Sequence, residues 1–443
     1  MPKTHKILTE YPVFKVILRY ALPSVMGLLF YGMQNVLDGI IVGRFMGTDA
    51  LAGVNLIFPL YSAIAVIAIM TGVGSQATIG RSLGRKEVEK AKDAITTGFI
   101  FVVAGCTVFA IPAFIFAGNI TSLLGANAEL FPYSAGYMKG LLLLSPFIGL
   151  MFYSDYMLKI GGHPRYAFLV MSSTILLNVT LNLSFILLFN LGTFGVGLAT
   201  GLAFMTGSLM GSFILFKKKA PISMLAGKFK LKLLREMLYN GSSEGMTEFS
   251  VGISLLLFNY TFMQYAGADG VAAFTVIGYI CFLGTTLFLG VSDGLIPVIS
   301  YNYGIGNHNR IRQILKFAAR INFTIGTFIF LALLFFSRYM VELFVGGKDT
   351  AVVNLAVSGA SIYAFAFLIE GLNILLSSYY TALGKARYSL IIASLRGLIL
   401  IIAGLLIFPR LMGTPGIWLT VPVAEALTVI AALFLLKKPV KKS

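Results

Sequence analysis

Long apolar stretches recur along the whole chain, and each is long enough to cross a bilayer as a helix. About 20 apolar residues suffice for one crossing, and such runs can be placed at about twelve positions. Their approximate limits are 20–43, 50–73, 94–117, 133–158, 166–190, 193–216, 237–265, 271–298, 317–337, 351–380, 388–409 and 414–436. Hydrophobic residues make up 58% of the 443 residues and charged residues only 12%. The sequence therefore predicts an all-α polytopic membrane protein with twelve transmembrane helices.

Basic residues gather on alternate connections between these runs. The net charge is +17, and most of the 34 Lys and Arg residues fall on the amino-terminal tail and on every second connection after it. Such an excess marks the cytoplasmic side of a membrane protein. We therefore expect both termini to be cytoplasmic and the chain to lie in the inner or plasma membrane. The charge indicates topology, and no nucleic-acid partner is expected.

The two halves of the chain repeat each other. The segment GTDALAGVN from Gly47 recurs as GADGVAAFT from Gly267, and GGHPRYAF from Gly161 is answered by LGKARYSL from Leu383. At the first offset, of 220 residues, Gly74 matches Gly294 and Gly84 matches Gly304. Each half holds six runs, so the copies enter the membrane in the same direction, and substrate sites in such transporters lie between the copies. We predict an amino lobe at 1–216, a cytoplasmic basic linker at 217–235 and a carboxyl lobe with a basic tail at 236–443.

Both copies also carry a polar, glycine-bounded stretch after their second run. These stretches are SQATIGRSLGRKEVEKAKDAI and SYNYGIGNHNRIRQILKFAAR. Their amphipathic pattern is typical of helices that lie at the membrane interface. We predict two cytoplasmic surface helices.

Polar side chains in the first half converge on one depth in the membrane. From the predicted helix limits, Asp38, Asn182 and Thr200 lie at nearly the same height, because each residue of a helix rises about 1.5 Å. Asn178 shares a helix face with Asn182, and Gln34 shares one with Asp38. The side-chain oxygens of Asp38, Asn178, Asn182 and Thr200 are ligands of the kind that Na⁺ prefers. The Asp38 carboxylate could equally bind a proton, because burial raises its affinity for one. Alternatively, Asp38 is solvated at headgroup level, and the Asn and Thr side chains only bond neighbouring helices.

The second half carries a different set of charged residues. Asp38 maps onto Phe258 in the repeat, so this carboxylate has no twin. Since an unpaired charge is costly in the membrane, we expect Arg396 to pair with a glutamate. Asp155, close to the cytoplasmic surface, is either solvated or used in transport. The candidate substrate-binding or coupling residues are Gln34, Asp155, Glu244, Glu248 and Glu370.

Several functional classes find little support in the sequence. No GK[ST] follows any glycine-rich stretch, so ATP is not expected as the energy source. An enzyme is not expected, because the sequence shows neither a nucleophile with its base nor a metal cluster. We expect no cofactor apart from a coupling ion. A channel fits less well than alternating access around a site between two repeated lobes. A flippase for a lipid-linked substrate would need basic groups in its cavity, yet few residues within the spans are basic, Lys139 and Arg396 among them.

The order and spacing of several segments resemble the multidrug and toxic compound extrusion (MATE) family. They include LPSVMGLL, NVLDGIIVGRFMGTDALAGVN, GRKEVEKA, PVISYNYGIGNHNRIRQIL, GSSEGMTEFSVGISLLLFN and GIWLTVPVAEALT. The resemblance implies two six-helix lobes in a V and the exchange of Na⁺ or H⁺ for cationic amphiphilic drugs. We expect such drugs and membrane lipids as partners of a monomer.

The resemblance also implies roles for individual residues. Asp38 falls on the family's carboxylate in the first helix, and Asn178 and Thr200 match cation-site positions. Asn182 departs from the pattern, because several members carry aspartate there, so the choice between Na⁺ and H⁺ stays open. Glu244 and Glu248 lie where other branches place a carboxylate on the seventh helix.

Overall fold

The helices form where the apolar runs lie in the sequence. The computed structural model describes all residues except 1, 217–222, 226, 346–349 and 438–443. Regular structure in this described part is helical, with no β-strand.

The amino half contains ten helices among its described residues. They are α1 (Pro2–Thr9), α2 (Val13–Met46), α3 (Thr48–Leu56), α4 (Phe58–Gly84), α5 (Val88–Ile115), α6 (Ala117–Leu123), α7 (Phe131–Leu143), α8 (Ser145–Ile160), α9 (Pro164–Leu187) and α10 (Gly192–Leu215). The carboxyl half is built in the same way but includes one 3₁₀ turn, η1, and one π-helical turn, η2. Its elements are α11 (Leu231–Gly304), α12 (His308–Val345), α13 (Thr350–Tyr363), η1 (Ala364–Ala366), α14 (Phe367–Ala382), α15 (Ala386–Ser394), η2 (Leu395–Ile399), α16 (Leu400–Met412) and α17 (Thr414–Lys437).

These elements provide the twelve membrane spans that the sequence predicts. Ten helices or continuous helix groups in the described residues are long and apolar enough to cross a membrane. The pair α7 and α8, bent by 58°, forms one further span. The 74-residue α11 contains two spans, because its backbone leaves the helical region at Gly267, where φ is 63° and ψ is −154°. A side chain would be strained at that φ, so glycine allows the chain to reverse there.

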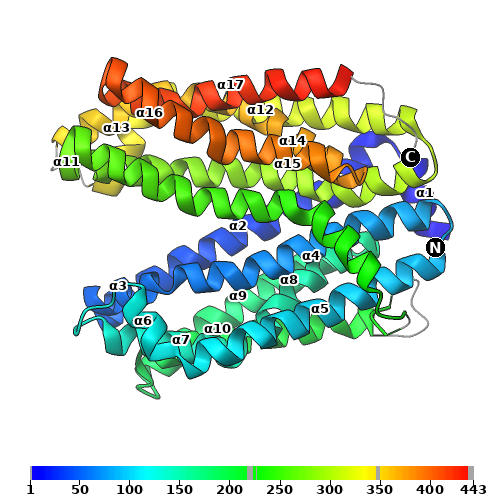
Figure 1. Ribbon diagram of the computed structural model, residues 1–443, viewed down its shortest axis with the longest axis horizontal. Coiled ribbons are helices and arrows are strands. Elements are labelled where there is room, and N and C mark those ends of the chain that lie inside the picture. The colour runs from blue at the N-terminus through cyan, green and yellow to red at the C-terminus, as the bar shows by residue number, and fades with distance from the viewer. Residues whose placement is uncertain (1, 217–222, 226, 346–349, 438–443) are drawn as a thin grey trace.

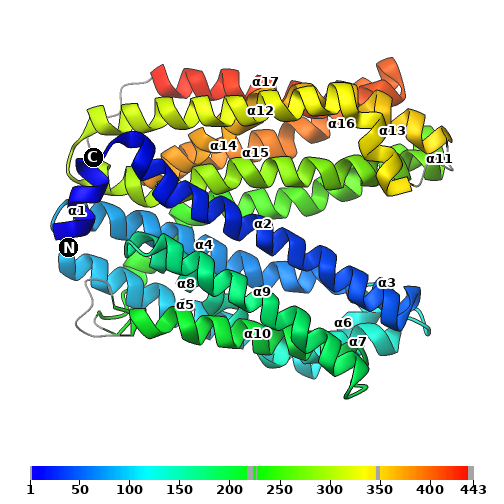
Figure 2. The same cartoon turned by 180° about the vertical axis from the view of Figure 1, so that it is seen from behind.

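The spans form two lobes that diverge toward one end of the molecule. In Figure 1 the amino half makes the lower lobe and the carboxyl half the upper lobe, and both views show the lobes together at the end where α1 lies. We call this the basic end, because the turns at 85–87, 161–163, 305–307 and 383–385 lie there. Arg85, Lys86 and Lys385 belong to these turns, and Lys159, Arg165 and Arg310 flank the other two. The helix α2 starts beside the upper lobe and ends in the lower one (Figure 2). The V-shaped pair of lobes is thus confirmed.

Paired glycines bring the two lobes into backbone contact at the basic end. A Cβ atom at Gly84 would lie 2.8 Å from the Cα of Gly304, and a Cβ at Gly304 would lie 2.8 Å from the Cα of Gly84. Since these two glycines are equivalent in the repeat, they meet on the axis that relates the lobes. The other matched pair makes corresponding contacts, Gly74 with the backbone of Met237 and Gly294 with that of α2. The parallel internal repeat is therefore seen in the packing as well as in the sequence.

We expect Gly84→Val to destabilise the protein by about 1–3 kcal/mol, because the added atoms force apart two backbones that cannot yield. A Cβ at Gly84 would already lie 2.4 Å from the carbonyl oxygen of Tyr301. Thermal unfolding of the detergent-purified protein measures the effect. Gly252→Val is the matched control, since nothing lies within 4 Å of a Cβ at that helical glycine. Equal melting temperatures for both variants would contradict close packing at the axis.

The two predicted surface helices do not form. The first polar stretch is divided between the end of α4 and the start of α5, and the second between α11 and α12. The polar side of α4 contacts the other lobe. Arg81 is buried and its Nη1 donates to the carbonyl oxygens of Thr381 (3.5 Å) and Ala382 (3.2 Å) at the end of α14. An amphipathic pattern cannot distinguish a membrane surface from a second lobe, which explains the error.

The basic linker partly docks onto the amino lobe. Of the predicted segment 217–235, residues 217–222 and 226 lie outside the described part, and 231–235 already belong to α11. Asp93 on α5 accepts a hydrogen bond from the backbone N–H of Lys228 (2.8 Å) and forms an ion pair with Lys230. Thr96 bonds the backbone at Met224 and Gly227. The division of the chain at this segment stays a prediction.

Candidate functional site

The polar residues of α2, α9 and α10 form one connected cluster. Asn182 Nδ2 donates to Asp38 Oδ1 at 2.7 Å and to Asn178 Oδ1 at 3.3 Å. Asn178 Nδ2 in turn donates to Thr200 Oγ1 at 3.2 Å. The three helices thus bring these four side chains into one hydrogen-bonded cluster. The common depth of Asp38, Asn182 and Thr200 stays a prediction. We call them the amino-lobe site.

Two buried acceptor oxygens at or beside the amino-lobe site have no described hydrogen-bond partner. Asn182 is fully buried, yet its Oδ1 has no hydrogen-bond partner in the described structure. Gln34, one turn before Asp38, is also buried and leaves its Oε1 without a partner. A buried acceptor without a partner is costly, and a cation or an added proton donor removes that cost. The arrangement can therefore accept one more positive group.

Small residues on α10 set the position of Thr200. A Cβ at Gly197 would lie 2.3 Å from the carbonyl oxygen of Tyr137, and one at Gly201 would lie 2.8 Å from the side chain of Leu144. The helix can approach α7 and α8 this closely only because these positions lack side chains. Thr200 also donates to the Val196 carbonyl at 3.1 Å, which fixes its hydroxyl.

The equivalent place in the carboxyl lobe is filled by aromatic rings. Phe258, the counterpart of Asp38, stacks on Phe274 with ring centroids 5.0 Å apart. Phe262, one turn later, lies 4.7 Å from the ring of Trp418. No ionisable group replaces the carboxylate among these contacts, so the two lobes differ chemically, as the repeat predicts.

Arg396 joins two glutamates in the centre of the carboxyl lobe. Its Nη2 lies 2.9 Å from Glu370 Oε1, and its Nε donates to Glu425 Oε1 at 3.0 Å. Thr285 Oγ1 donates to Glu370 Oε1 at 2.9 Å, and Asn373 Nδ2 donates to Glu425 Oε2 at 2.6 Å. The expected pairing of Arg396 is confirmed, and it involves two glutamates. We call these three charged residues the arginine cluster.

A π-helical turn positions Arg396, and the sequence pattern does not reveal it. Arg396 lies in η2, where one residue more per turn than in an α-helix changes the direction of the side chains. Ser254 Oγ on α11 donates to the Gly397 carbonyl at 2.7 Å. This bond satisfies a carbonyl group of the irregular turn.

A second group of carboxylates lies beside the arginine cluster. Glu244 on α11 is buried, while Glu248, one turn further, is exposed. Asp293, on the second span of α11, accepts a hydrogen bond from Ser378 Oγ at 3.1 Å. The sequence reasoning missed Asp293, although a carboxylate within the predicted span 271–298 was signal enough.

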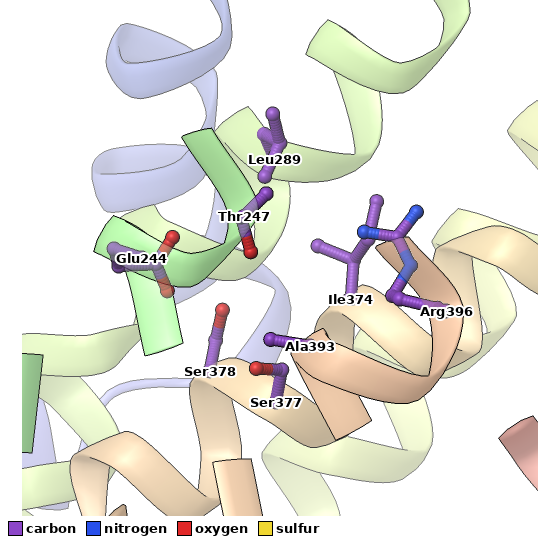
Figure 3. A pocket seen from close by; sticks show the side chains of 8 residues that line it. All are labelled: Glu244, Thr247, Leu289, Ile374, Ser377, Ser378, Ala393 and Arg396. Carbon is purple, nitrogen blue, oxygen red and sulfur yellow. The ribbon is translucent and has the colours of Figure 1, made fainter. Parts of the chain in front are cut away.

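A small cavity separates Glu244 from the arginine cluster. Its volume is about 10 Å³, room for about one water molecule, and Figure 3 shows Glu244 and Arg396 on opposite sides of it, with Ser377 and Ser378 between. No ion pair of Glu244 occurs in the described part of the chain. The carboxyl lobe thus holds two glutamates that share one arginine, and a further carboxylate beside a small cavity.

Asp155 forms an ion pair within α8. Lys159 Nζ lies 2.5 Å from Asp155 Oδ2, and the side chains are only 8% and 15% exposed respectively. The alternative that Asp155 is merely solvated is therefore wrong. Among the described residues, no hydrogen bond or ion pair links this pair to the amino-lobe site or to the arginine cluster.

Solved structures show the same fold. "Crystal structure of MATE in complex with MaL6" has a TM-score of 0.91 at 23% identity and covers 98% of this chain and 97% of that one. "Outward-facing conformation of a multidrug resistance MATE family transporter of the MOP superfamily" has a TM-score of 0.89 at 22% identity, with 97% and 96% covered.

Curated relatives and a family model also match most of this chain. Multidrug export protein MepA of Staphylococcus aureus (strain MRSA252) is 24% identical over 428 residues, covering 96% of this chain and 93% of MepA. MepA of Staphylococcus saprophyticus is 23% identical over 431 residues. The MatE model matches twice, at residues 23–184 and 245–406, one match in each lobe. Because these two matches span most of the chain, the protein belongs to the MatE (MATE) family of membrane transporters.

Proposed function

We propose that this protein is a secondary antiporter that exports cationic amphiphilic drugs in exchange for Na⁺ or H⁺. The observation that carries the proposal is the amino-lobe site, where the Asp38 carboxylate meets amide and hydroxyl groups and Asn182 Oδ1 has no described partner. The export of several drugs is supported by the name of the MepA relatives, whose match covers 96% of this chain. An acidic interior with few basic groups favours cationic cargo.

The coupling ion acts by neutralising Asp38. For Na⁺, the ligands would be oxygens of Asp38, Asn178, Asn182 and Thr200, which is the donor set a hard cation prefers. In the present arrangement the Asn182 amide offers its N–H to Asp38. Turning this amide by half a rotation would present its oxygen instead. For H⁺, Asp38 takes up the proton directly and no amide needs to turn.

Helix α2 connects the ion site to both lobes. Its outer half carries Asp38 against α9, while its inner half packs on α11, where a Cβ at Gly290 would lie 2.5 Å from the Cα of Val25. A change at Asp38 therefore acts on an element that both lobes contact. We infer alternating access, in which ion and drug each disfavour the state that binds the other, and this coupling must be reciprocal.

The carboxyl lobe supplies the candidate drug-binding carboxylates. Arg396 already pairs with Glu370, so Glu370 serves chiefly in the arginine cluster. Glu244 lies beside the small cavity, and Glu248 is exposed one turn away. Asp293 accepts a hydrogen bond from Ser378, which lines the same cavity. We propose that these three attract the positive charge of the substrate. Asp155 and Gln34 remain candidates for a coupling role.

Transport in proteoliposomes tests the proposal. We expect efflux of an ethidium-like cation to start when an inward Na⁺ or proton gradient is imposed, and to stop when both gradients are collapsed. Separate Na⁺ and proton gradients identify the coupling ion. Faster movement of an anionic lipid than of the cation would instead support a flippase. We infer a monomer in the plasma membrane with the basic end in the cytoplasm, in agreement with the positive-inside rule.

A further inference from the structure

Helix α12 presents a stripe of basic side chains at the basic end. Its 38 residues would extend to about 57 Å, well beyond the roughly 30 Å of the hydrocarbon core. Arg312, Lys316 and Arg320 follow each other at intervals of four residues, so they share one face, and all three are exposed. No acidic side chain of the described structure pairs with them. Their positive charge is therefore open to the membrane surface.

The stripe leads into a groove between α12 and α14. The groove has a volume of about 300 Å³, with Arg320 at its edge and apolar walls formed by Phe323, Leu368 and Leu372. Phe323 is 60% exposed. Leu368 and Leu372 lie one turn apart on the face of α14 opposite Glu370, since two residues correspond to about 200° of rotation. The groove thus faces away from the arginine cluster and toward the membrane.

A buried polar atom lies at the floor of this groove. Asn322 is 1% exposed, and its Nδ2 donates to the Gly371 carbonyl at 2.8 Å and to Ser292 Oγ at 3.4 Å. Its Oδ1 has no hydrogen-bond partner among the described residues. A purely hydrocarbon occupant would leave this acceptor unsatisfied, whereas a headgroup hydroxyl or its bound water supplies a donor.

We propose that this groove is a binding site for an anionic phospholipid. Lys316 and Arg320 hold the phosphate, and one acyl chain lies along Phe323, Leu368 and Leu372. Basic pockets between transmembrane helices on the cytoplasmic side are known to suit anionic headgroups, and each Lys or Arg adds an electrostatic attraction. The charge at the groove's edge selects an anionic lipid over a zwitterionic one. The site is independent of the drug and of the coupling ion.

The site adjoins the carboxylates of the same lobe. Asn322 bonds Gly371, which follows Glu370, and Ser292, which precedes Asp293. A lipid that orders this part of α12 therefore stabilises the two helices that carry these carboxylates. The consequence is a greater thermal stability of the whole protein in anionic lipid.

Native mass spectrometry of the full chain with phosphatidylglycerol or phosphatidylcholine tests the site. We expect the wild type to retain phosphatidylglycerol preferentially and to melt at a higher temperature with it. Arg320→Gln and Lys316→Gln should each weaken retention about fivefold. Inorganic phosphate alone should not raise the melting temperature, because it cannot fill the apolar groove.

The matched control is Arg338→Gln, at the far end of the same helix, where Arg338 already pairs with Glu342 and Asn354. It should retain the lipid as the wild type does. Leu372→Trp should reduce lipid retention by filling the groove, and if it fails to fold, the two charge variants still decide. Equal retention of both lipids by the wild type, or equal loss in Arg320→Gln and Arg338→Gln, would overturn the proposal.

Discussion

Asp38→Asn should abolish most gradient-driven efflux while leaving the fold intact. The substitution removes the only carboxylate in the hydrogen-bonded cluster of the amino lobe, but it keeps a side chain that can bond Asn182. We expect a loss of roughly 5- to 150-fold in the response to the gradient, the usual range of coupling between two sites. Initial rates of cation efflux from proteoliposomes, under Na⁺ and proton gradients in turn, measure it.

Two further variants define what this loss means. Asp49→Asn removes an exposed carboxylate on α3, and it should transport as the wild type does. Asn182→Asp adds a second carboxylate in place of the amide that bonds Asp38, at a position where the resemblance implies aspartate in several members of the family. If the wild type is coupled to H⁺, efflux by Asn182→Asp should respond to a Na⁺ gradient as well. Unchanged efflux in Asp38→Asn under both gradients would show that the amino-lobe site does not couple transport.

Arg396→Met should destabilise the protein by about 3–5 kcal/mol, the cost of leaving a buried ionic partner uncompensated. The loss would leave Glu370 and Glu425 facing each other in the interior, where their side chains are only 6% and 4% exposed. Thermal unfolding in detergent measures the effect. The exposed pair Arg338 and Glu342 supplies the comparison, and Arg338→Met should cost less than about 1 kcal/mol.

A triple variant separates charge from packing at the arginine cluster. Arg396→Met combined with Glu370→Gln and Glu425→Gln removes all three charges, and such replacements of buried ionic groups are often neutral. The triple variant should therefore melt close to the wild type. If it melts as low as Arg396→Met alone, the guanidinium matters through its volume and not through its charge. If Arg396→Met itself melts as the wild type does, the cluster contributes nothing to stability.

Regular periodicity explains why much of the amino-lobe site could be predicted. A helix rises by a constant step, so counting residues from the helix ends places Asp38, Asn182 and Thr200 at one depth without any knowledge of packing. Their hydrogen bonds show that α2, α9 and α10 also turn these faces toward each other. The roles of these residues in binding an ion stay predictions.

Patterns that several environments share led to the errors. The polar stretch after the second span is amphipathic, but its polar face meets the other lobe, where Arg81 bonds the end of α14. Asp155 lies near the surface in sequence, yet it is largely covered and paired with Lys159. The covering of Arg81 and Asp155 does not follow from the local sequence, because burial depends on which distant segment covers a face.

Composition, length and order along the chain predict the number of spans, the parallel repeat and the chemical difference between the lobes. Helix packing is needed to see that Arg396 bonds both Glu370 and Glu425, that Asp293 bonds Ser378 beside the cavity at Glu244, and that Gly84 meets Gly304 on the axis. Pairing between helices depends on their rotation and crossing, and the π-helical turn at Arg396 changes that rotation locally. Side chains far apart in the chain meet only after the helices have packed.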